Sequence, residues 1–387
     1  MPRIGLNSQI LFLSSSVSWR VIDHDEGSRE VEIQWVKHHN SLMSTHGDVT
    51  NDDERIAHDL AILAGAAARA VASYLRRAVS HVESVDFKAD HHDPVTVHDK
   101  RVESALHVLL GCFVPGSRVL GEETGERTLP RKFDGPTEEF TEDFEFPTSP
   151  LVQGARRRCM SLAERVRWIV DPIDGTANFA AGMPYFNTSI AAELDGAVVA
   201  GAINAPIMDH LFLADLTHAW LRTDGEDIDI HAQGPTSERD AVVLSYHPSL
   251  HSFINDPAGS AEEYTRLAST YQAVRRPGAA ALDLAMVASG RAGAMLAGTM
   301  KPWDVAAGIP LVKVGGVCTP AGIHMVKVAG GNVVNAPMGT DLPDGVRPGV
   351  AAWVGSMEAP VLQELLHQAD SRRSGDARPA QDDGDRS

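Results

Sequence analysis

The chain has 387 residues, 43% of them hydrophobic and 22% charged, and its formal net charge at pH 7 is −18. This length and apolar share suffice for one large domain or two ordinary domains with a buried core. The negative charge argues against a nucleic-acid-binding surface or attraction to anionic lipid, because both need clustered Lys and Arg. The three cysteines lie far apart and form neither a disulfide framework nor a metal-binding pair, so we expect a reducing cytoplasm.

The first fifty residues mix polar runs with apolar fragments and show no sustained helical period. We predict that residues 1–50 form an extension without fixed structure, and Met43 is an alternative translation start. The apolar stretch at 10–13 is too short for a signal peptide. No window reaches the roughly 18 to 20 apolar residues of a membrane helix, so we expect a soluble protein without membrane contact.

Regular elements are expected from residue 53 onwards. Apolar residues recur at helical spacing over 53–77, and a second helix is expected at 97–113. Residues 118–120 and 166–170 are short apolar strands, each followed directly by acidic residues. The segment 125–165 between them is long and irregular, and its stretch 134–145 is acidic without a basic residue, so we expect a flexible insertion or lid.

The remaining elements divide into two halves and a tail. The turn Asp195-Gly196 lies between two apolar runs and predicts an antiparallel hairpin within the first half, 51–205. Residues 206–368 alternate strand-like and helical runs, the pattern of an α/β layer, whereas 369–387 lack apolar periodicity and should be disordered. The helices expected in the second half are 262–273, 280–289, 304–313 and 359–368.

The most informative segment is Asp-Pro-Ile-Asp-Gly-Thr at 171–176, directly after the strand at 166–170. Proline stiffens this turn, Gly175 permits unusual dihedral angles, and Thr176 can open a helix. Backbone N–H groups at a helix start suit a phosphate, while Asp171 and Asp174 can bind metal ions beside it. Alone, Asp-Pro and Asp-Gly pairs are ordinary turn signals.

Two further acidic pieces are Gly-Glu-Glu at 121–123 and Trp-Asp at 303–304. Carboxylates gathered in one cleft repel by roughly 4 kcal/mol per close pair at an effective dielectric constant near 20, and divalent metal ions would relieve this repulsion. Oxygen-only ligands favour Mg²⁺ or Mn²⁺ over Zn²⁺. Each piece also has an ordinary structural interpretation: Gly-Glu-Glu can be a solvated strand end, and Asp304 can cap a helix. Asp99 and Glu103, four residues apart on a helix, would likewise normally face solvent.

Taken together and in order, these segments resemble the inositol monophosphatase superfamily over roughly residues 53–358. The resemblance implies an α/β fold, a layered αβαβα sandwich of the inositol monophosphatase and sugar phosphatase type. It also implies Mg²⁺-dependent hydrolysis of phosphate monoesters, often inhibited by Li⁺. The matching segments are Lys88, 93–99, 121–123, 168–179 and 303–308.

The resemblance implies a role for each matching residue. Glu122, Asp171 and the Ile173 carbonyl would hold one metal ion, and Asp171, Asp174 and Asp304 a second, in a site of two or three ions. Thr176, aided by Asp99, would orient a water for in-line attack on phosphorus, and the metal would lower the pKa of that water. The implied phosphate and substrate contacts are Asp174, Gly175, Thr176, Gly278, Ala279 and Ala280, with Glu123, Lys88 and Lys301 in support.

One position departs from the family pattern. Inositol phosphatases commonly place a carboxylate, which binds sugar hydroxyls, where this chain has Ala297. A methyl group cannot accept those hydrogen bonds, so inositol phosphate is a doubtful dedicated substrate and Ala297→Glu should improve its hydrolysis. Histidinol phosphate and 3′-phosphoadenosine nucleotides are competing substrates.

We therefore predict a cytoplasmic Mg²⁺-dependent phosphomonoesterase acting on a small polyol, sugar or amino-alcohol phosphate. Its partner would be a small phosphorylated metabolite, with neither nucleic acid nor membrane, and homodimers are common in similar proteins. The non-enzyme alternative is a catalytically silent metal- or ligand-binding protein on the same fold. Intact Glu122, Asp171, Asp174, Thr176 and Asp304 favour the enzyme.

Overall fold

The computed structural model describes residues 17–21, 33–37, 51–80, 86–87, 94–132, 140, 143–298, 320–336 and 349–376. The chain divides into two compact units, Met1–Asn51 and Asp52–Ser387. In the first unit β1 (Val17–Val21) pairs antiparallel with β2 (Ile33–Lys37). The prediction that residues 1–50 lack structure is therefore wrong for these strands, whose β-branched and aromatic residues favour extended backbone.

The first sheet of the second unit has the strand order β12-β11-β10-β9-β8-β7-β5-β6. Neighbouring strands are antiparallel except β5 and β7, which run parallel with Gly121 opposite Val170. Their carboxyl ends therefore lie at the same edge of the sheet, which brings the turn after Gly121 beside the end of β7. The strands are β5 (Arg118–Gly121), β6 (Gly125–Thr128), β7 (Val166–Asp174), β8 (Asn187–Leu194), β9 (Ala197–Ala205), β10 (His210–Ala214), β11 (Ala219–Thr223) and β12 (Glu226–Asp229).

The second sheet is smaller and has the order β14-β13-β15-β17-β16. β13 runs parallel to both β14 and β15, and the two remaining pairs are antiparallel. Its strands are β13 (Val242–Ser245), β14 (Ala273–Arg275), β15 (Ala294–Ala297), β16 (Asn332–Ala336) and β17 (Gly349–Trp353). A short pair, β3 (Asp86–Phe87) and β4 (Pro94–Val95), precedes the first sheet in sequence.

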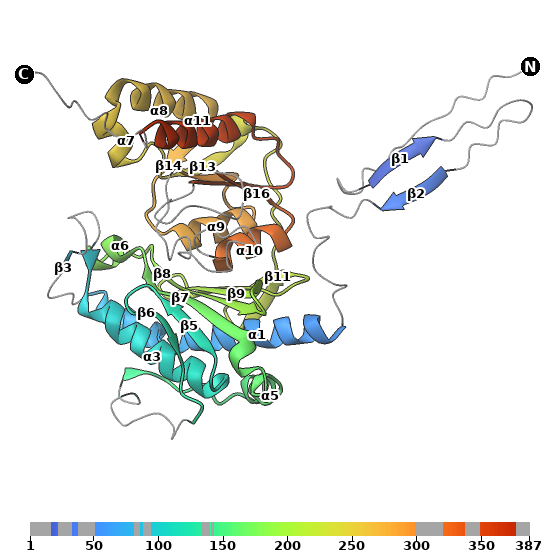
Figure 1. Cartoon of the computed structure of the whole chain (residues 1–387). Coiled ribbons are helices and arrows are strands. Elements are labelled where there is room, and N and C mark those ends of the chain that lie inside the picture. Colours follow the sequence, from blue (N-terminus) through green and yellow to red (C-terminus); the bar gives the residue numbers. More distant parts are fainter. Residues whose placement is uncertain are drawn as a thin grey trace, which may run out of the picture. The chain divides into compact units, whose positions relative to one another are not determined.

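Helices and sheets alternate in layers in the second unit (Figure 1). α1 (Asn51–Ala70), α2 (Ala72–Ala78), α3 (Val97–Phe113) and α5 (Pro150–Cys159) cover one face of the first sheet. α9 (Ala280–Ala288) and α10 (Pro320–Val328) lie between the sheets, and α8 (Pro257–Thr270) and α11 (Pro360–Asp376) cover the outer face of the second. The predicted αβαβα sandwich is confirmed. The shorter helices are α6 (Thr176–Ala180), α7 (Leu250–Asn255) and the 3₁₀ turns Ala163–Arg165 and Glu238–Asp240.

Several predicted elements match the structure closely. The helix at 97–113 is confirmed, and the hairpin around Asp195-Gly196 forms between β8 and β9. Both turn residues have a positive φ, 53° for Asp195 and 86° for Gly196, as a tight hairpin turn requires. The predicted division after residue 205 falls inside the first sheet, because β10, β11 and β12 extend that sheet to Asp229.

The prediction of an irregular segment over 125–165 is wrong where regular elements form, whereas the described residues 129–132 and 144–149 have none. The segment contains β6 and the helix α5, whose Ser149 side chain caps the first turn with Pro150 at its start. Phe140, Phe144 and Val152 are buried in the core over the first sheet. These buried side chains anchor the described part of the segment to the core.

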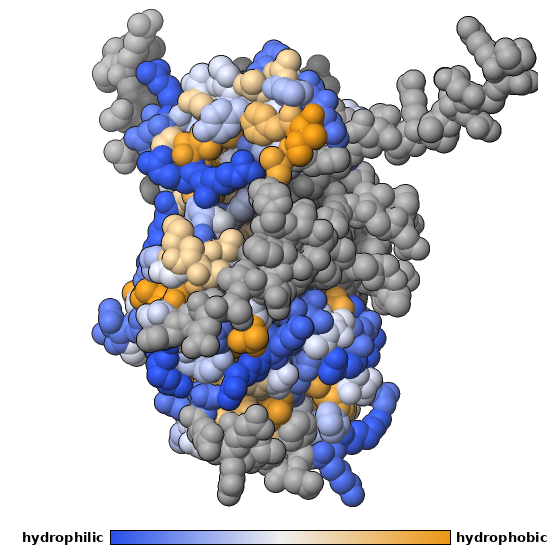
Figure 2. Space-filling view, turned by 90° about the vertical axis from the view of Figure 1, so that its left-hand side faces the viewer, coloured by the Kyte–Doolittle hydropathy of each residue, from blue (hydrophilic) through white to orange (hydrophobic). Residues whose placement is uncertain are grey.

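The tail and the first helix differ from expectation too. α11 continues to Asp376, so the predicted disorder over 369–387 is wrong for 369–376, and 377–387 lie outside the described residues. The stretch Asn51–Ala78 is long and apolar enough to cross a membrane by length and composition, although we expected no such window, and 72% of its apolar 18-residue window is buried inside the structure. On the face shown in Figure 2, hydrophilic residues cover much of the described surface and apolar ones lie between them.

Candidate active site

The turn between β7 and α6 requires a glycine for two reasons. Gly175 has a φ of 90°, in the left-handed region that L side chains rarely adopt. A Cβ atom there would lie 3.0 Å from the Cβ of Ala279 and 3.1 Å from the carbonyl oxygen of Gly278. The structure therefore brings the loop at 278–280 into direct contact with the Asp-Pro-Ile-Asp-Gly-Thr segment.

Asp174 is the last residue of β7, and its side chain caps the start of α9. Its carboxylate oxygens accept hydrogen bonds from the backbone N–H groups of Ala280 at 3.0 Å and Ala281 at 2.8 Å, and from the Asn187 side chain at 2.7 Å. No side chain of α9 itself supplies this cap. Burial raises the pKa of Asp174 to about 6, against the lowering effect of these bonds, and the charge of Glu122 raises it further.

Thr176 is the first residue of α6, and its hydroxyl is fixed by two acceptors. Its Oγ1 lies 2.9 Å from the Ile173 carbonyl oxygen and 3.2 Å from Oδ1 of Asp99. The other carboxylate oxygen of Asp99 accepts from the N–H and the hydroxyl of Thr96, both at 2.7 Å, in a capping box. Asp99 is buried, not solvent-facing as the spacing alone suggests, since the loop after β7 covers it.

The acidic turn after β5 converges on the same place. Burial is the largest cause that raises the pKa of Asp99 to about 6, and the charges of Glu123 and Glu122 raise it as well. Glu122 has the same effect on Asp174. The backbone N–H of Glu122 donates to the Val170 carbonyl oxygen at 3.2 Å, which holds this turn against the end of β7. Asp171 lies opposite Ser189 on β8, at the same end of β7.

The donors present have the chemistry that a hard divalent cation needs. Glu122, Asp171 and Asp174 offer carboxylates and Ile173 a carbonyl, and oxygen donors suit Mg²⁺ or Mn²⁺. Among the described residues, however, no group of three or more His, Cys, Asp or Glu side chains is arranged to hold a metal ion. The ligand set stays a prediction that needs Asp304, which lies outside the described residues together with Lys88 and Lys301.

Sequence reasoning missed two sets of buried contacts around the site. Glu103 accepts a hydrogen bond from the Glu123 N–H, although its spacing from Asp99 suggested a solvated helix face. Asp283 on α9 accepts from the Tyr185 hydroxyl at 2.6 Å and the Tyr246 hydroxyl at 2.7 Å. Burial raises the pKa of Asp283 to about 7. Gly121 lies against the Glu103 carboxylate, and the glycine at this position could be understood as a sign of that contact only from the structure.

The side-chain amide of Asn178 connects the loop at Tyr185 with the loop at Pro277. The Asn178 side chain donates to the carbonyl oxygens of Tyr185 at 2.7 Å and Pro277 at 2.8 Å. Gly278, whose φ is 95°, packs so closely on Asn178 that a Cβ would lie 3.1 Å from its Nδ2. The predicted substrate loop is thereby fixed to the segment after α6.

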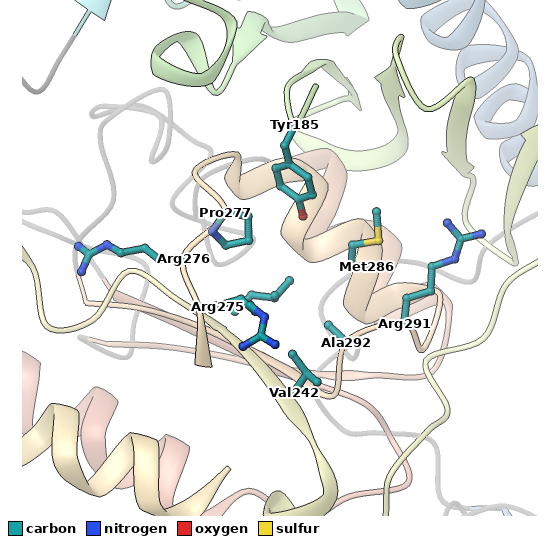
Figure 3. Close-up of a pocket in the computed structure, with 9 residues that line it drawn as sticks. Tyr185, Val242, Arg275, Arg276, Pro277, Met286, Arg291 and Ala292 are labelled. Carbon is teal, nitrogen blue, oxygen red and sulfur yellow. The ribbon is translucent and has the colours of Figure 1, made fainter. Parts of the chain in front are cut away.

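A hollow of about 370 Å³ lies beside this loop (Figure 3). Tyr185, Pro277 and Met286 line it, and the Arg276 and Arg291 side chains extend to opposite sides. Among the described residues, none of those predicted to bind metal or act in catalysis lines it. The hollow is therefore a neighbour of the site rather than its centre.

Ala297 ends β15 and is fully buried. A glutamate at this position would have to enter the packed core beside the second sheet, where an ionised carboxylate loses its hydration. The expectation that Ala297→Glu improves inositol phosphate hydrolysis therefore conflicts with the environment of this residue.

The layered fold and the acidic edge of the first sheet define a class of metal-dependent phosphatases. The model of the inositol monophosphatase family matches residues 51–368, and the chain belongs to this family. The chain is therefore a phosphatase, which is a phosphoric monoester hydrolase, in agreement with curated relatives named inositol-1-monophosphatase.

Individual relatives agree with this assignment. The chain is 37% identical over 150 residues to an inositol-1-monophosphatase of Mesorhizobium japonicum, an alignment that spans 39% of this chain and 54% of the relative. It is 31% identical over 225 residues to the inositol-1-monophosphatase SuhB of Mycobacterium tuberculosis H37Rv, spanning 58% of this chain and 67% of the relative. The crystal structure of the extragenic suppressor protein suhB from Bartonella henselae superposes with a TM-score of 0.55 at 26% identity, covering 81% of this chain and 97% of that one.

Proposed function

We propose that this chain is a Mg²⁺-dependent phosphomonoesterase that hydrolyses a small polyol or sugar phosphate. The observation that carries the proposal is the Thr176 hydroxyl, held 2.9 Å from the Ile173 carbonyl oxygen and 3.2 Å from Asp99 beside the acidic end of β7. A hydroxyl fixed by two acceptors next to carboxylates suits a water that must be aligned for attack.

The cation would be held by oxygen ligands from both strand ends. Glu122, Asp171, Asp174, Asp304 and the Ile173 carbonyl are the proposed ligands for two or three Mg²⁺ ions, with Mn²⁺ as a substitute. When bound, such ions act as Lewis acids that lower the pKa of water and neutralise charge on phosphate. Because Asp174 is already held by three donors, its carboxylate would meet the cation without reorientation.

The proton of the attacking water would leave through Thr176. As the water gives a proton to the Thr176 oxygen, the threonine gives its own proton to Oδ1 of Asp99. A carboxyl group with a pKa of about 6 is ionised at pH 7 and yet basic enough to accept that proton. Thr96 holds the other oxygen of Asp99, so the accepting oxygen keeps its direction. The phosphate would accept hydrogen bonds from the N–H groups of Gly175 and Thr176.

For the substrate we propose only a chemical class, small polyol or sugar phosphates. Buried Ala297 offers no carboxylate to inositol hydroxyls, while the Gly278–Ala280 loop presents backbone next to Gly175. Relatives carry different names, among them "Nus factor SuhB" and "Fructose-1,6-bisphosphatase/inositol-1-monophosphatase", so names alone do not select one substrate. Histidinol phosphate and 3′-phosphoadenosine nucleotides stay as alternatives. We further propose a cytoplasmic, Li⁺-sensitive enzyme that forms homodimers.

A substrate panel tests the proposal. Phosphate release from inositol 1-phosphate, histidinol phosphate and 3′-phosphoadenosine 5′-phosphate is measured with Mg²⁺ and with a chelator, on the native chain and on Asp171→Asn. We expect Mg²⁺-dependent release from at least one monoester and less than about a tenth of that rate in the variant. A native chain that releases phosphate from none of them under any divalent cation would support the catalytically silent alternative.

A further inference from the structure

The Glu103 side chain lies fully buried on α3, one helical turn after Asp99. An ionised carboxylate in such a place needs hydrogen-bond donors to offset its lost hydration. Glu103 receives them from the turn that carries Glu122: its Oε2 accepts from the Glu123 N–H at 2.8 Å, and its Oε1 accepts from the Thr124 hydroxyl. The donors therefore come from the acidic turn and not from α3 itself.

The glycine before Glu122 is explained by the same carboxylate. A Cβ on Gly121 would lie 2.5 Å from Cδ of Glu103 and 2.6 and 2.7 Å from its two oxygens, closer than real Cβ contacts allow. Gly121 does not have a positive φ, so its dihedral angles do not require glycine. Glycine is required here because the Glu103 carboxylate occupies the space that a Cβ would need. Residues 121–124 thus fold around the carboxylate on both sides.

Other groups near Glu103 do not replace these contacts. His107 lies one turn further along α3, with its Nε2 3.7 Å from Oε1 of Glu103, and burial lowers the pKa of His107 to about 4, so it is neutral at pH 7. The charges of Glu122 and Glu123 oppose the ionised form of Glu103. The charges of these three carboxylates therefore repel one another in the folded state, which costs stability.

α3 consequently connects both acidic segments. Asp99 on its first turn contacts Thr176 after β7, and Glu103 on its second turn contacts the turn after β5. The parallel pairing of β5 with β7 sets the same two segments side by side, with Gly121 opposite Val170. A single helix thereby fixes the distance between the Glu122 turn and the Asp171 end of β7.

We propose that Glu103 is a positioning residue that fixes the Glu122 carboxylate for cation binding by closing the 121–124 turn onto α3. It touches neither cation nor substrate. This inference rests on the proposed function, since it assigns to Glu122 a ligand role in the same site. Outer hydrogen-bond partners of metal ligands typically contribute about 10- to 100-fold in metal affinity or activity.

The first test compares Mn²⁺ affinity, measured by calorimetry, with the catalytic rate. Glu103→Ala should weaken Mn²⁺ binding about 10-fold or more, and Glu103→Gln less, since its amide still offers one acceptor oxygen. At saturating Mg²⁺ the kcat should stay within about threefold of native, because the Asp99 contact with Thr176 is untouched. Glu193→Gln is the matched control: Glu193 is equally buried, but it pairs with Arg167 at the opposite end of β7.

The second test uses the contact between Gly121 and Glu103. Gly121→Ala in the native chain should weaken Mn²⁺ binding about as much as Glu103→Ala does, because the new methyl group displaces the carboxylate. In the Glu103→Ala background the same substitution should add little, since the obstructing carboxylate is gone. Such non-additivity is expected for residues in contact and not for distant, independent sites.

The outcomes separate the two proposals. If Glu103→Ala and Glu103→Gln keep native Mn²⁺ affinity and only lower the melting temperature, Glu103 is structural and the inference is overturned. If the effects of Gly121→Ala and Glu103→Ala simply add, the inference is overturned as well. Native chain that binds Mn²⁺ but hydrolyses no monoester contradicts the proposed function alone, and native chain that binds no Mn²⁺ contradicts both.

Discussion

Replacing Thr176 by valine removes a hydroxyl and nearly preserves the shape of the side chain. The hydroxyl has one proton and two acceptors, the Ile173 carbonyl at 2.9 Å and Oδ1 of Asp99 at 3.2 Å. It therefore donates one hydrogen bond at a time. Asp99 keeps both bonds from Thr96, so the variant should retain the fold around α3.

The structural cost of this change is small compared with its expected kinetic cost. Losing one buried hydrogen bond to a carboxylate costs about 1.5 to 3 kcal/mol of unfolding free energy. That corresponds to a drop in melting temperature of several degrees, on the scale of about 2–4 °C per kcal/mol for a large domain. Loss of the proposed proton relay should reduce kcat about 10²- to 10⁴-fold, or about 3 to 5 kcal/mol of activation free energy.

The assay measures phosphate release at saturating Mg²⁺ for the best monoester, together with Mn²⁺ affinity and melting temperature. Thr176→Ser keeps the hydroxyl and should retain kcat within about tenfold. The reasoning is refuted if Thr176→Val keeps more than about a tenth of native kcat, or if serine is as poor as valine. A parallel collapse of Mn²⁺ affinity in Thr176→Val would show that the residue shapes the metal site instead.

Three further predictions address stability. A hydrogen bond to Asp215 raises the pKa of His58 above 6.5, so its stabilising effect is fully present below pH 6.5 and is lost as pH rises through the raised value; the melting-temperature gap between native and His58→Ala chains should shrink from pH 6 to pH 8, and a constant gap would contradict this. His58 is nearly half exposed, so the effect should be about 1 kcal/mol or less. Arg158→Ala leaves the buried Asp59 without its two 2.6 Å bonds and should cost about 2 kcal/mol in urea unfolding, with Arg158→Lys intermediate; an unchanged midpoint would mean that α5 is not held to α1 through this pair. Ala297→Glu should lower stability without improving hydrolysis of inositol 1-phosphate, and a stable variant with a higher kcat/KM would contradict the burial argument.

The parts of the fold that sequence predicts well are those in which local pattern and tertiary environment agree. The helix at 97–113 has both a helical period and a capping threonine at its start, and the Asp195-Gly196 turn has the residues that a tight hairpin needs. α5 carried both signals, because its buried residues Val152, Ala155 and Cys159 follow a helical period and its Ser149-Pro150 start is a capping signal. It was missed because the acidic stretch at 134–145 led to a single irregular segment being expected over 125–165.

The candidate site was predictable to the extent that its residues are adjacent in sequence. Asp171, Asp174 and Thr176 share one segment, and the parallel pairing of β5 with β7 brings Glu122 to them. Glu103 could not be assigned, because an acidic residue four positions after Asp99 normally faces solvent. Only the fold shows that backbone and hydroxyl donors of another loop surround it. Asp174 as the cap of α9 was likewise invisible, since cap and helix lie about a hundred residues apart.

The most direct measurement of the proposed metal centre is anomalous diffraction from crystals soaked in Mn²⁺. We predict anomalous density in contact with the carboxylates of Glu122 and Asp171 and the carbonyl oxygen of Ile173, within reach of Asp174. That density should weaken strongly in Asp171→Asn crystals soaked identically. Density confined to other surfaces, with none between the turn after β5 and the end of β7, would contradict the assignment of these residues as the metal-binding centre of a phosphatase.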